Sequence, residues 1–162
     1  MIIVFLDIDG VINIWRKPGK DPSGRFDQEA LNNLKLILKA VPEALMVISS
    51  TWRFHYTLME LRGFFAEAGI DAERILDVTP DLRRTEGQIK HYPGKNEEIE
   101  AWLFQHPEVK RLAILDDVSM EDMVGFEDQF FQTRFEEGLK HYQSQRIIDH
   151  LRRIRSALSS DN

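Results

Sequence analysis

Two apolar segments of the sequence each end in a pair of aspartates. Asp7 and Asp9 end the first segment, and Asp116 and Asp117 end the second. Alternation along an extended chain places Asp7 and Asp9 on the same side. Carboxylates this close repel one another unless a cation or a shared proton intervenes, and a set of carboxylate oxygens suits Mg²⁺. The sequence therefore predicts a magnesium site, provided that the two segments are parallel strands ending at one edge of a sheet.

Each aspartate pair also has a purely structural explanation. Gly10 allows the sharp departure of the chain that a site at a strand end needs. An isolated Asp-x-Asp, however, is commonly a capped turn with two solvated acids. Asp117 or Ser119 could begin a helix, because Ser119 and Asp122 have the spacing of a capping box. The two explanations of the second pair are compatible, since a residue that begins a helix can also bind an ion.

A third apolar segment is followed by hydroxyl and arginine side chains, at Ser50, Thr51 and Arg53. Hydroxyls at a strand end can donate to a phosphate oxygen, and arginine can bind phosphate through two hydrogen bonds. Simple helix capping by Ser50 or Thr51 is the alternative.

Lys95 stands at the start of a predicted helix, where a cation opposes the helix dipole. An exposed lysine at this place would be a slight misfit. A bound phosphate would make it favourable, because the ammonium group and the helix amides would attract the same anion. Lys90 is the alternative, but it lies farther from the helix start.

Apolar strand-like segments alternate with amphipathic helical segments along the chain. The predicted strands are 2–6, 44–48, 75–78, 111–115 and 129–132, and the predicted helices are one capped by Asp27, then 54–68, 96–105 and 143–158. This alternation predicts one α/β domain over residues 1–162, a three-layer, Rossmann-like parallel sheet with helices on both faces. Ligands of such sheets bind at the carboxyl ends of the strands.

The composition excludes several classes of protein. The 162 residues contain no cysteine, which excludes disulfides, cysteine-bound metals and a cysteine nucleophile. The net charge of −6 argues against a basic coat for nucleic acid. No apolar segment reaches membrane-spanning length, and the apolar start is too short for a signal peptide. We therefore expect a cytoplasmic protein without a membrane partner, and its oligomeric state stays open.

Taken in order, these motifs resemble the haloacid dehalogenase (HAD) superfamily of phosphohydrolases. The resemblance lies in Asp7-Ile8-Asp9-Gly10, the Ser50/Thr51 hydroxyls, Lys95 and the pair at 116–117, each after the expected element. It runs from the first strand to Asp116 and implies a HAD-like fold. The phrases FLDIDGVIN, ISSTWR and GK-x-EEI-x-x-WL further resemble the HAD domains of RNA-repair proteins.

The resemblance implies a Mg²⁺-dependent phosphatase that acts through an aspartyl-phosphate. Asp7 would be the nucleophile, and Asp9 would protonate the leaving oxygen and later activate water. Mg²⁺ would be held by Asp7, Asp116 and the backbone carbonyl of Asp9, with Asp117 assisting. Lys95 would stabilise Asp7 and the transferring phosphoryl group.

Other roles follow from the same resemblance. Thr51 or Ser50 would hydrogen-bond a phosphoryl oxygen, and Thr51 is favoured because Thr51-Trp52-Arg53 matches a [ST]-x-Arg pattern of many members. Arg53 and Gly10 are expected to contact the substrate. The second acid, Asp9, indicates chemistry at phosphorus, since members that act on carbon–halogen bonds lack it.

The lengths of the connecting segments suggest the substrate. Neither the segment from Asp9 to Asp27 nor that from Arg53 to Lys95 has room for a large cap domain, so we expect an open site that accepts a large substrate, a polymer end or a protein. The favoured substrate is the 3′-phosphate end of RNA or DNA. A nucleic-acid backbone and a terminal base could be bound by basic and aromatic residues in these loops. They are Trp15, Arg16, Lys17, Lys20 and Arg25 in the first loop, and Arg83, Arg84, Lys90 and His91 in the second. The alternatives are two solvated loops, a nucleotide or sugar-phosphate substrate, or a non-catalytic module that binds a phosphorylated ligand.

Overall fold

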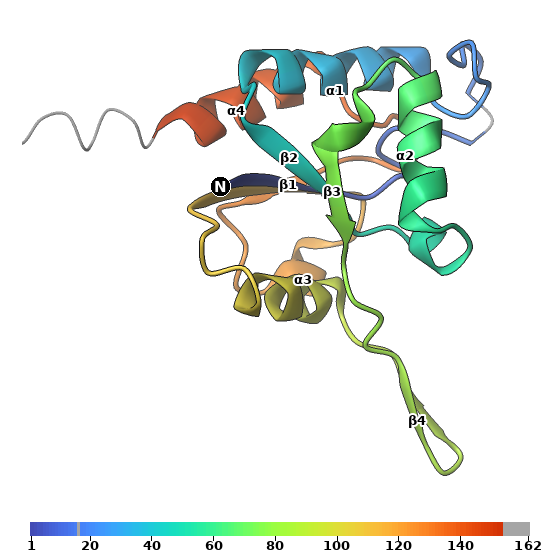
Figure 1. Cartoon of the computed structure of the whole chain (residues 1–162), viewed down its shortest axis with the longest axis vertical. Coiled ribbons are helices and arrows are strands. Elements are labelled where there is room, and N and C mark those ends of the chain that lie inside the picture. Colours follow the sequence, from blue (N-terminus) through green and yellow to red (C-terminus); the bar gives the residue numbers. More distant parts are fainter. Residues whose placement is uncertain (16, 154–162) are drawn as a thin grey trace, which may run out of the picture.

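The computed structural model describes residues 1–15 and 17–153, and its centre is a five-stranded parallel sheet in the order β3-β2-β1-β6-β7 (Figure 1). The strands are β1 (Ile2–Leu6), β2 (Ala44–Ile48), β3 (Ile75–Val78), β6 (Arg111–Asp116) and β7 (Phe130–Gln132). The predicted parallel sheet is confirmed, and the predicted bounds of the first three strands coincide with the observed ones. The chain leaves each strand at the same edge, so the side chains that follow the strands gather there.

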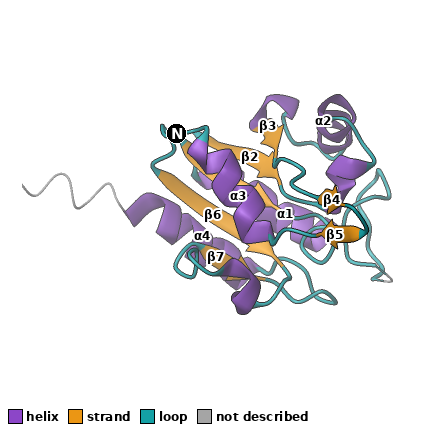
Figure 2. Cartoon of the chain, turned by 90° about the horizontal axis from the view of Figure 1, so that it is seen from below, coloured by secondary structure: helices purple, strands orange, loops and turns teal. Residues whose placement is uncertain are grey.

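Within the described residues, four α-helices cover the two faces of this sheet. They are α1 (Gln28–Ala40), α2 (Leu58–Glu67), α3 (Lys95–Phe104) and α4 (His141–Arg152). Helices α1, α2 and α4 lie on one side, and α3 lies across the other (Figures 1 and 2). The three-layer, Rossmann-like architecture is therefore confirmed. No helix of the described chain combines the length and apolar character needed to cross a bilayer.

The central strand β1 is buried on both faces, which explains its unbroken run of apolar residues. Val4 and Leu6 belong to the core under α1, α2 and α4. Ile3 and Phe5 belong to a second core, under α3. Successive side chains of a strand point to opposite faces, so both layers of helices are anchored on the same five residues.

The register of the sheet places three strand ends at one level. Leu6 of β1 pairs with Ile48 of β2 on one side and with Leu115 of β6 on the other. Asp7, the residue after β1, continues this ladder, because its amide donates to the Leu115 carbonyl at 2.9 Å. The residues that follow these strands must therefore lie side by side.

The helix boundaries differ from the predicted ones mainly at α2. The chain after β2 first forms a short 3₁₀ helix, η1 (Thr51–Phe54), and α2 begins at Leu58 rather than near residue 54. A capping box between Thr57 and Glu60 sets this start, because each side chain satisfies a backbone amide of the other residue. Arg16 of the first basic loop and the predicted extension of the last helix over 154–158 lie outside the described residues.

The segment between β3 and α3 contains a β-hairpin where a loop was predicted. Strand β4 (Arg84–Glu86) pairs antiparallel with β5 (Ile89–His91), and Gly87 takes a positive φ of 61° in the turn. The prediction was wrong because all six strand residues are exposed, so no apolar alternation marks them. The hairpin projects from the body near the start of α3 (Figures 1 and 2). The described part of the chain forms no large cap domain.

Candidate active site

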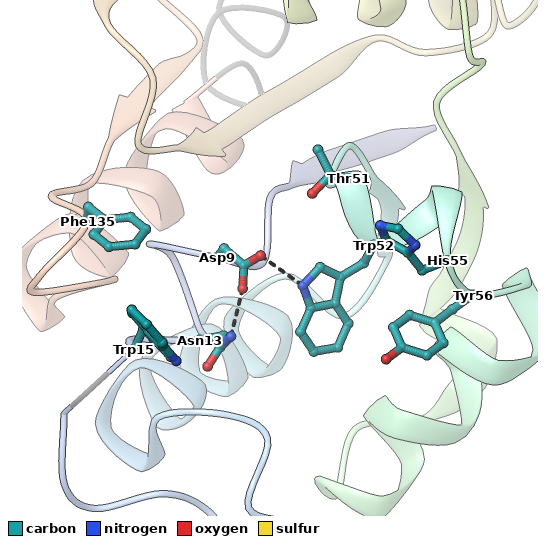
Figure 3. Close-up of a pocket in the computed structure, with 8 residues that line it drawn as sticks. All are labelled: Asp9, Asn13, Trp15, Thr51, Trp52, His55, Tyr56 and Phe135. Carbon is teal, nitrogen blue, oxygen red and sulfur yellow. Dashed lines mark hydrogen bonds between the residues drawn. The ribbon is translucent and has the colours of Figure 1, made fainter.

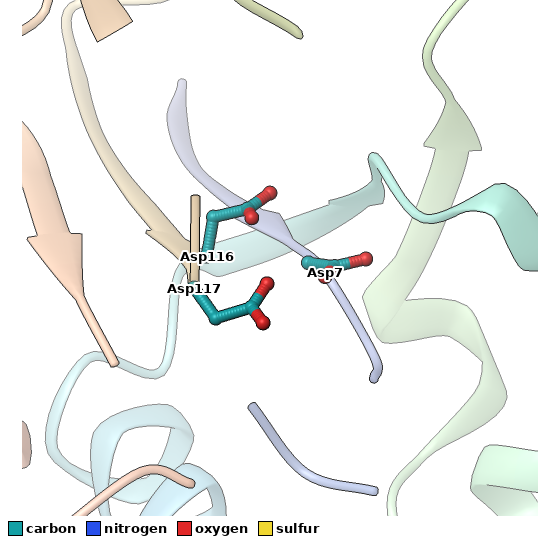
Figure 4. Close-up of side chains that lie close together, drawn as sticks. All are labelled: Asp7, Asp116 and Asp117. Atoms are coloured by element: carbon teal, nitrogen blue, oxygen red, sulfur yellow. The ribbon is translucent and has the colours of Figure 1, made fainter. Parts of the chain in front are cut away.

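Three carboxylates converge where β1 and β6 end (Figure 4). Oxygen atoms of Asp7, Asp116 and Asp117 all lie within 4.8 Å of one another. Asp7 is 6% exposed and Asp116 is fully buried, whereas Asp117 is half-buried. Adjacent parallel strands that end at the same level account for this meeting of residues more than a hundred positions apart.

Lys95 reaches the carboxylates from α3, the helix on the face of the sheet opposite to α1, α2 and α4. Its Nζ lies 3.2 Å from an oxygen of Asp7 and forms an ion pair and hydrogen bond with Asp116. Lys95 is the first residue of α3, whose N-cap, Gly94, makes no side-chain capping bond. Lys90 instead lies on the exposed hairpin. The structure thus brings Lys95, and not Lys90, to the acids.

The electrostatics of the cluster favour a bound cation. Burial raises the pKa of Asp7 to about 6, although Lys95 opposes this shift; the charge of Asp116 adds to it. Burial also raises the pKa of Asp116, again against Lys95. For Asp117, burial and the charge of Asp7 both raise the pKa. Three carboxylates share one ammonium group here, so a divalent cation with a preference for oxygen would relieve the repulsion.

The two hydroxyls after β2 have different surroundings. The Ser50 side chain is fully buried, and its hydroxyl lowers the pKa of Asp7, against the larger effect of burial. Its oxygen also accepts from the Trp52 amide at 3.3 Å, so Ser50 caps η1 as well. Thr51 is exposed and lines a pocket with Asp9. The choice between Ser50 and Thr51 as phosphate ligand stays a prediction.

The Asp9 carboxylate does not join the acid cluster. One of its oxygens accepts from Asn13 Nδ2 at 2.7 Å, and the other accepts from the indole nitrogen of Trp52 at 2.9 Å (Figure 3). Any contribution of Asp9 to a metal site therefore falls to its backbone carbonyl, as the resemblance implies. The side chain is left facing the pocket.

Gly10 lets the two acidic segments approach closely. Its φ is +78°, and a Cβ at this position would lie 2.5 Å from a carboxylate oxygen of Asp117 and 3.0 Å from the Phe135 ring. A larger residue would therefore push Asp117 out of the cluster. This packing explains the glycine, and substrate contact by Gly10 stays a prediction.

Arg53 is engaged inside the fold. Its guanidinium forms an ion pair with Glu98 of α3, and these side chains are only 4% and 7% exposed. It also donates to the Ser50 carbonyl at 2.8 Å. Arg53 thus ties the segment after β2 to the helix that carries Lys95, and the guanidinium predicted to contact substrate is already paired. Glu98 lies within the phrase GK-x-EEI-x-x-WL, but nothing in the sequence indicated that it would pair with Arg53.

Comparison with known families decides the relationship. A family model described as the HAD domain in Swiss Army Knife RNA repair proteins matches residues 3–144. The chain belongs to this family. Membership implies hydrolase chemistry of the phosphatase type in an RNA-repair context. No curated protein and no solved structure matches the chain.

The HAD domain has a pocket on the Asp9 side of the acid cluster (Figure 3). Its volume is about 530 Å³, and its lining consists of Asp9, Asn13, Trp15, Thr51, Trp52, His55, Tyr56 and Phe135. Trp52 is partly buried against the core, and its indole nitrogen also holds the Asp9 carboxylate. Sequence reasoning missed Asn13, His55, Tyr56 and Phe135, because nothing in their local patterns shows that they meet.

The basic residues of the first loop largely pair within the HAD domain. Lys17 contacts Asp27 at 3.1 Å, and Arg25 forms an ion pair with Glu67. Lys20 donates to the side chain of Asn13, at 2.9 Å. These intramolecular contacts organise the loop and leave less positive charge for a nucleic-acid backbone than the sequence suggested.

The basic residues of the hairpin are partly neutralised too. Arg83 donates to both carboxylate oxygens of Asp81. Arg84 and His91 both lie near Glu86, at 3.7 and 3.9 Å. A phosphate backbone would have to compete with these exposed acids.

Proposed function

We propose that this HAD domain is a Mg²⁺-dependent phosphatase that acts through an aspartyl-phosphate on Asp7. The observation that carries the proposal is the convergence of Lys95 with Asp7, Asp116 and Asp117, from three elements distant in sequence. A nucleophile, a cation site and an ammonium group in contact are the parts that phosphoryl transfer needs, since its catalysis is mostly positioning and charge neutralisation.

The acid cluster fits a magnesium ion. Its donors are all carboxylate oxygens, and the cluster contains no histidine, which favours a hard cation over zinc. Asp7 and Asp116, the backbone carbonyl of Asp9 and, in an assisting role, Asp117 would hold Mg²⁺. When bound, the ion supplies positive charge that neutralises the carboxylates and the transferring phosphoryl group.

The chemistry divides into two steps at phosphorus. An Asp7 oxygen attacks phosphorus while the bond to the leaving oxygen breaks, and Asp9 gives its proton to that oxygen. Asp9 then takes a proton from a water molecule whose oxygen attacks phosphorus. The bond between phosphorus and Asp7 breaks, inorganic phosphate leaves and the Asp7 carboxylate is restored. Trp52 and Asn13 hold the Asp9 carboxylate for both proton transfers.

Neighbouring polar groups support these steps. We infer that Ser50, whose buried hydroxyl lowers the pKa of Asp7, stabilises the charged Asp7 carboxylate, and that Thr51 contacts a phosphoryl oxygen from the pocket side. Lys95 offsets the negative charge on Asp7 and on the phosphoryl group. Arg53 positions Ser50 and α3 through its bonds to the Ser50 carbonyl and to Glu98.

The favoured substrate is the 3′-phosphate end of a nucleic acid. The RNA-repair context of the family and the lack of a large cap support a polymer end. A small nucleotide is the second candidate, because the pocket volume of about 530 Å³ lies in the usual range for small ligands, about 300–1,000 Å³.

A substrate panel with and without Mg²⁺ tests the proposal. The purified protein should release inorganic phosphate from 3′-phosphorylated RNA and from an aliphatic ester such as glycerol phosphate, and removal of Mg²⁺ should stop release. Asp7→Asn and Asp9→Asn should each lower kcat by about 10³-fold or more while circular dichroism stays unchanged. The matched control is Asp128→Asn, at an exposed residue outside the site.

Three outcomes would contradict parts of the proposal. Full activity in Asp7→Asn would reject the nucleophile. Fast turnover of metabolites with indifference to polymer ends would favour the small-molecule substrate. Binding of a phosphate analogue without hydrolysis of any ester would identify a non-catalytic module.

A further inference from the structure

Exposed aromatic side chains gather around the pocket beside Asp9. Trp15 is 69% exposed, Phe135 46% and Tyr56 39%. Large apolar side chains that surround one hollow, rather than lying scattered over the surface, mark a ligand site. These three come from the loop after β1, the end of the turn after β2 and the segment after β7, so only the tertiary structure unites them.

The pocket has aromatic side chains on two sides and polar groups between them. Figure 3 shows Trp15 and Phe135 on one side of Asp9, and Trp52 and Tyr56 on the other. The second side is held firmly: the Trp52 ring lies 5.6 Å from the Tyr56 ring, stacks on a buried phenylalanine and donates its N–H to Asp9. A flat ring placed in the pocket would meet aromatic surfaces, with carboxylate, amide and hydroxyl groups below it.

The lining suits a base better than a phosphate chain. None of the described residues that line the pocket is a lysine or an arginine, and one of its polar groups is the Asp9 carboxylate. Polyphosphates and nucleic-acid backbones require cations, whereas nucleobases bind through stacking on aromatic side chains. The flexible polar chain of a sugar phosphate would not use the aromatic side chains.

The place of Asp9 links the pocket to the chemistry. In the proposed function, on which this inference rests, Asp9 protonates the leaving oxygen. The rest of the leaving alcohol must therefore lie beside Asp9, in the space that these aromatic residues enclose. We propose that the pocket binds the nucleobase of the leaving nucleoside by stacking, so that the substrate is a phosphate monoester on the sugar of a terminal nucleotide.

Turnover of matched esters tests this assignment. We expect kcat/KM for a nucleoside 3′-monophosphate to exceed that for glycerol phosphate by about tenfold or more, with little dependence on the identity of the base, because stacking tolerates any base. In Trp15→Ala and in Phe135→Ala the ratio of the two kcat/KM values should fall by about tenfold, chiefly through KM. Phe104→Ala is the control, since Phe104 is 89% exposed at the end of α3 and does not line the pocket.

A binding measurement separates this inference from the proposed function. An unphosphorylated nucleoside should quench tryptophan fluorescence in Asp7→Asn, and Phe135→Ala in that background should weaken its binding by about tenfold. Equal kcat/KM for both esters, unchanged by Trp15→Ala, would overturn the stacking pocket and leave the phosphatase intact. Nucleoside binding without hydrolysis of any ester would overturn the phosphatase and leave the pocket.

Discussion

The two halves of the candidate site are built differently. The acid cluster stands on strand ends and on the first residue of α3, and two of its carboxylates are buried. The aromatic pocket stands on loops and on η1, and most of its side chains are exposed. Hydrogen-bonded strands hold the reacting groups at fixed separations, whereas loops can vary without disturbing the core. We therefore expect the residues at the strand ends to carry the reaction and the residues on the loops to select the substrate.

The halves also differ in charge. The cluster crowds three carboxylates around one ammonium group, which raises the pKa of each acid through burial and mutual repulsion. The loop half instead pairs its cations with acids, as Lys17 does with Asp27. Perturbed titrations are common at functional sites, so the contrast locates the reactive half independently of the motifs.

Among the variants that compare the two halves, Lys95→Met should lower kcat most; it keeps the length of the side chain and removes its charge. Asp7 and Asp116 lose their shared cation, so kcat should fall on the order of 10²–10³-fold. The free energy of unfolding without Mg²⁺ should fall by about 3 kcal/mol, and added Mg²⁺ should narrow this difference. Enzyme assays and urea unfolding check both, with the exposed Lys110→Met as control; unchanged kcat would remove Lys95 from the site.

Variants of the buried Arg53–Glu98 pair test whether this ion pair holds Ser50 and α3 in the positions that the acid cluster needs. Arg53→Met or Glu98→Gln alone leaves a buried charge without its partner and should cost about 3–5 kcal/mol of stability and lower kcat. The double variant Arg53→Met/Glu98→Leu should regain most of the stability but not kcat, because α3 loses its tie to Ser50.

The exposed ion pair between Arg25, in the loop before α1, and Glu67 of α2 serves as the comparison for the buried pair. Arg25→Met should cost less than about 1 kcal/mol, since the Glu67 side chain is 58% exposed and solvent screens the pair. Equal losses of unfolding free energy for the buried and the exposed pair, measured by urea unfolding, would contradict this difference between them.

Removal of each of the two hydroxyls after β2 should have a different kinetic effect, because Ser50 lies on the side of the acid cluster and Thr51 on the side of the pocket. Ser50→Ala removes the buried hydroxyl that lowers the pKa of Asp7 and should lower kcat by about tenfold on every ester. Thr51→Ala, on the pocket side, should act more on KM. Steady-state kinetics with glycerol phosphate and 3′-phosphorylated RNA decide this, and a larger loss of kcat in Thr51→Ala would make Thr51 the main phosphate ligand.

The loop before α1 should make a small contribution to stability that depends on pH. Burial alone would raise the pKa of Asp21, but hydrogen bonds from the Phe26 amide and from Ser23 outweigh it and hold the pKa below its ordinary value. A lowered folded-state pKa contributes stability above the unfolded pKa of about 3.9, and that contribution is lost as pH falls through the folded value.

Asp21→Asn should therefore cost about 1 kcal/mol at pH 7, and the deficit should shrink as the pH drops below about 4. Urea unfolding at pH 7 and pH 3 measures it, with the exposed Glu43→Gln as control. A deficit of the same size at both pH values would show that the charge of Asp21 is not what stabilises the loop.

Local sequence sufficed for the framework of the fold. Buried strands need unbroken apolar runs, so 2–6 and 44–48 were predicted with their observed bounds. The edge strand 75–78 was also predicted with its observed bounds, although it is only partly buried and contains Asp77. Asp27 caps α1 as predicted, because its side chain accepts from the Ala30 amide only three residues away. The hairpin escaped prediction, since its exposed strands follow no apolar pattern.

The sequence by itself determined which chemistry-bearing residues stand at the strand ends, because that depends on residues a few positions apart. The tertiary structure alone decided which of them meet. In the folded chain Lys95 contacts Asp7 and Asp116, Asp9 accepts a hydrogen bond from Trp52, and the aromatic side chains line one pocket. These contacts span tens to more than a hundred positions and follow from strand register and helix packing, which no local pattern encodes.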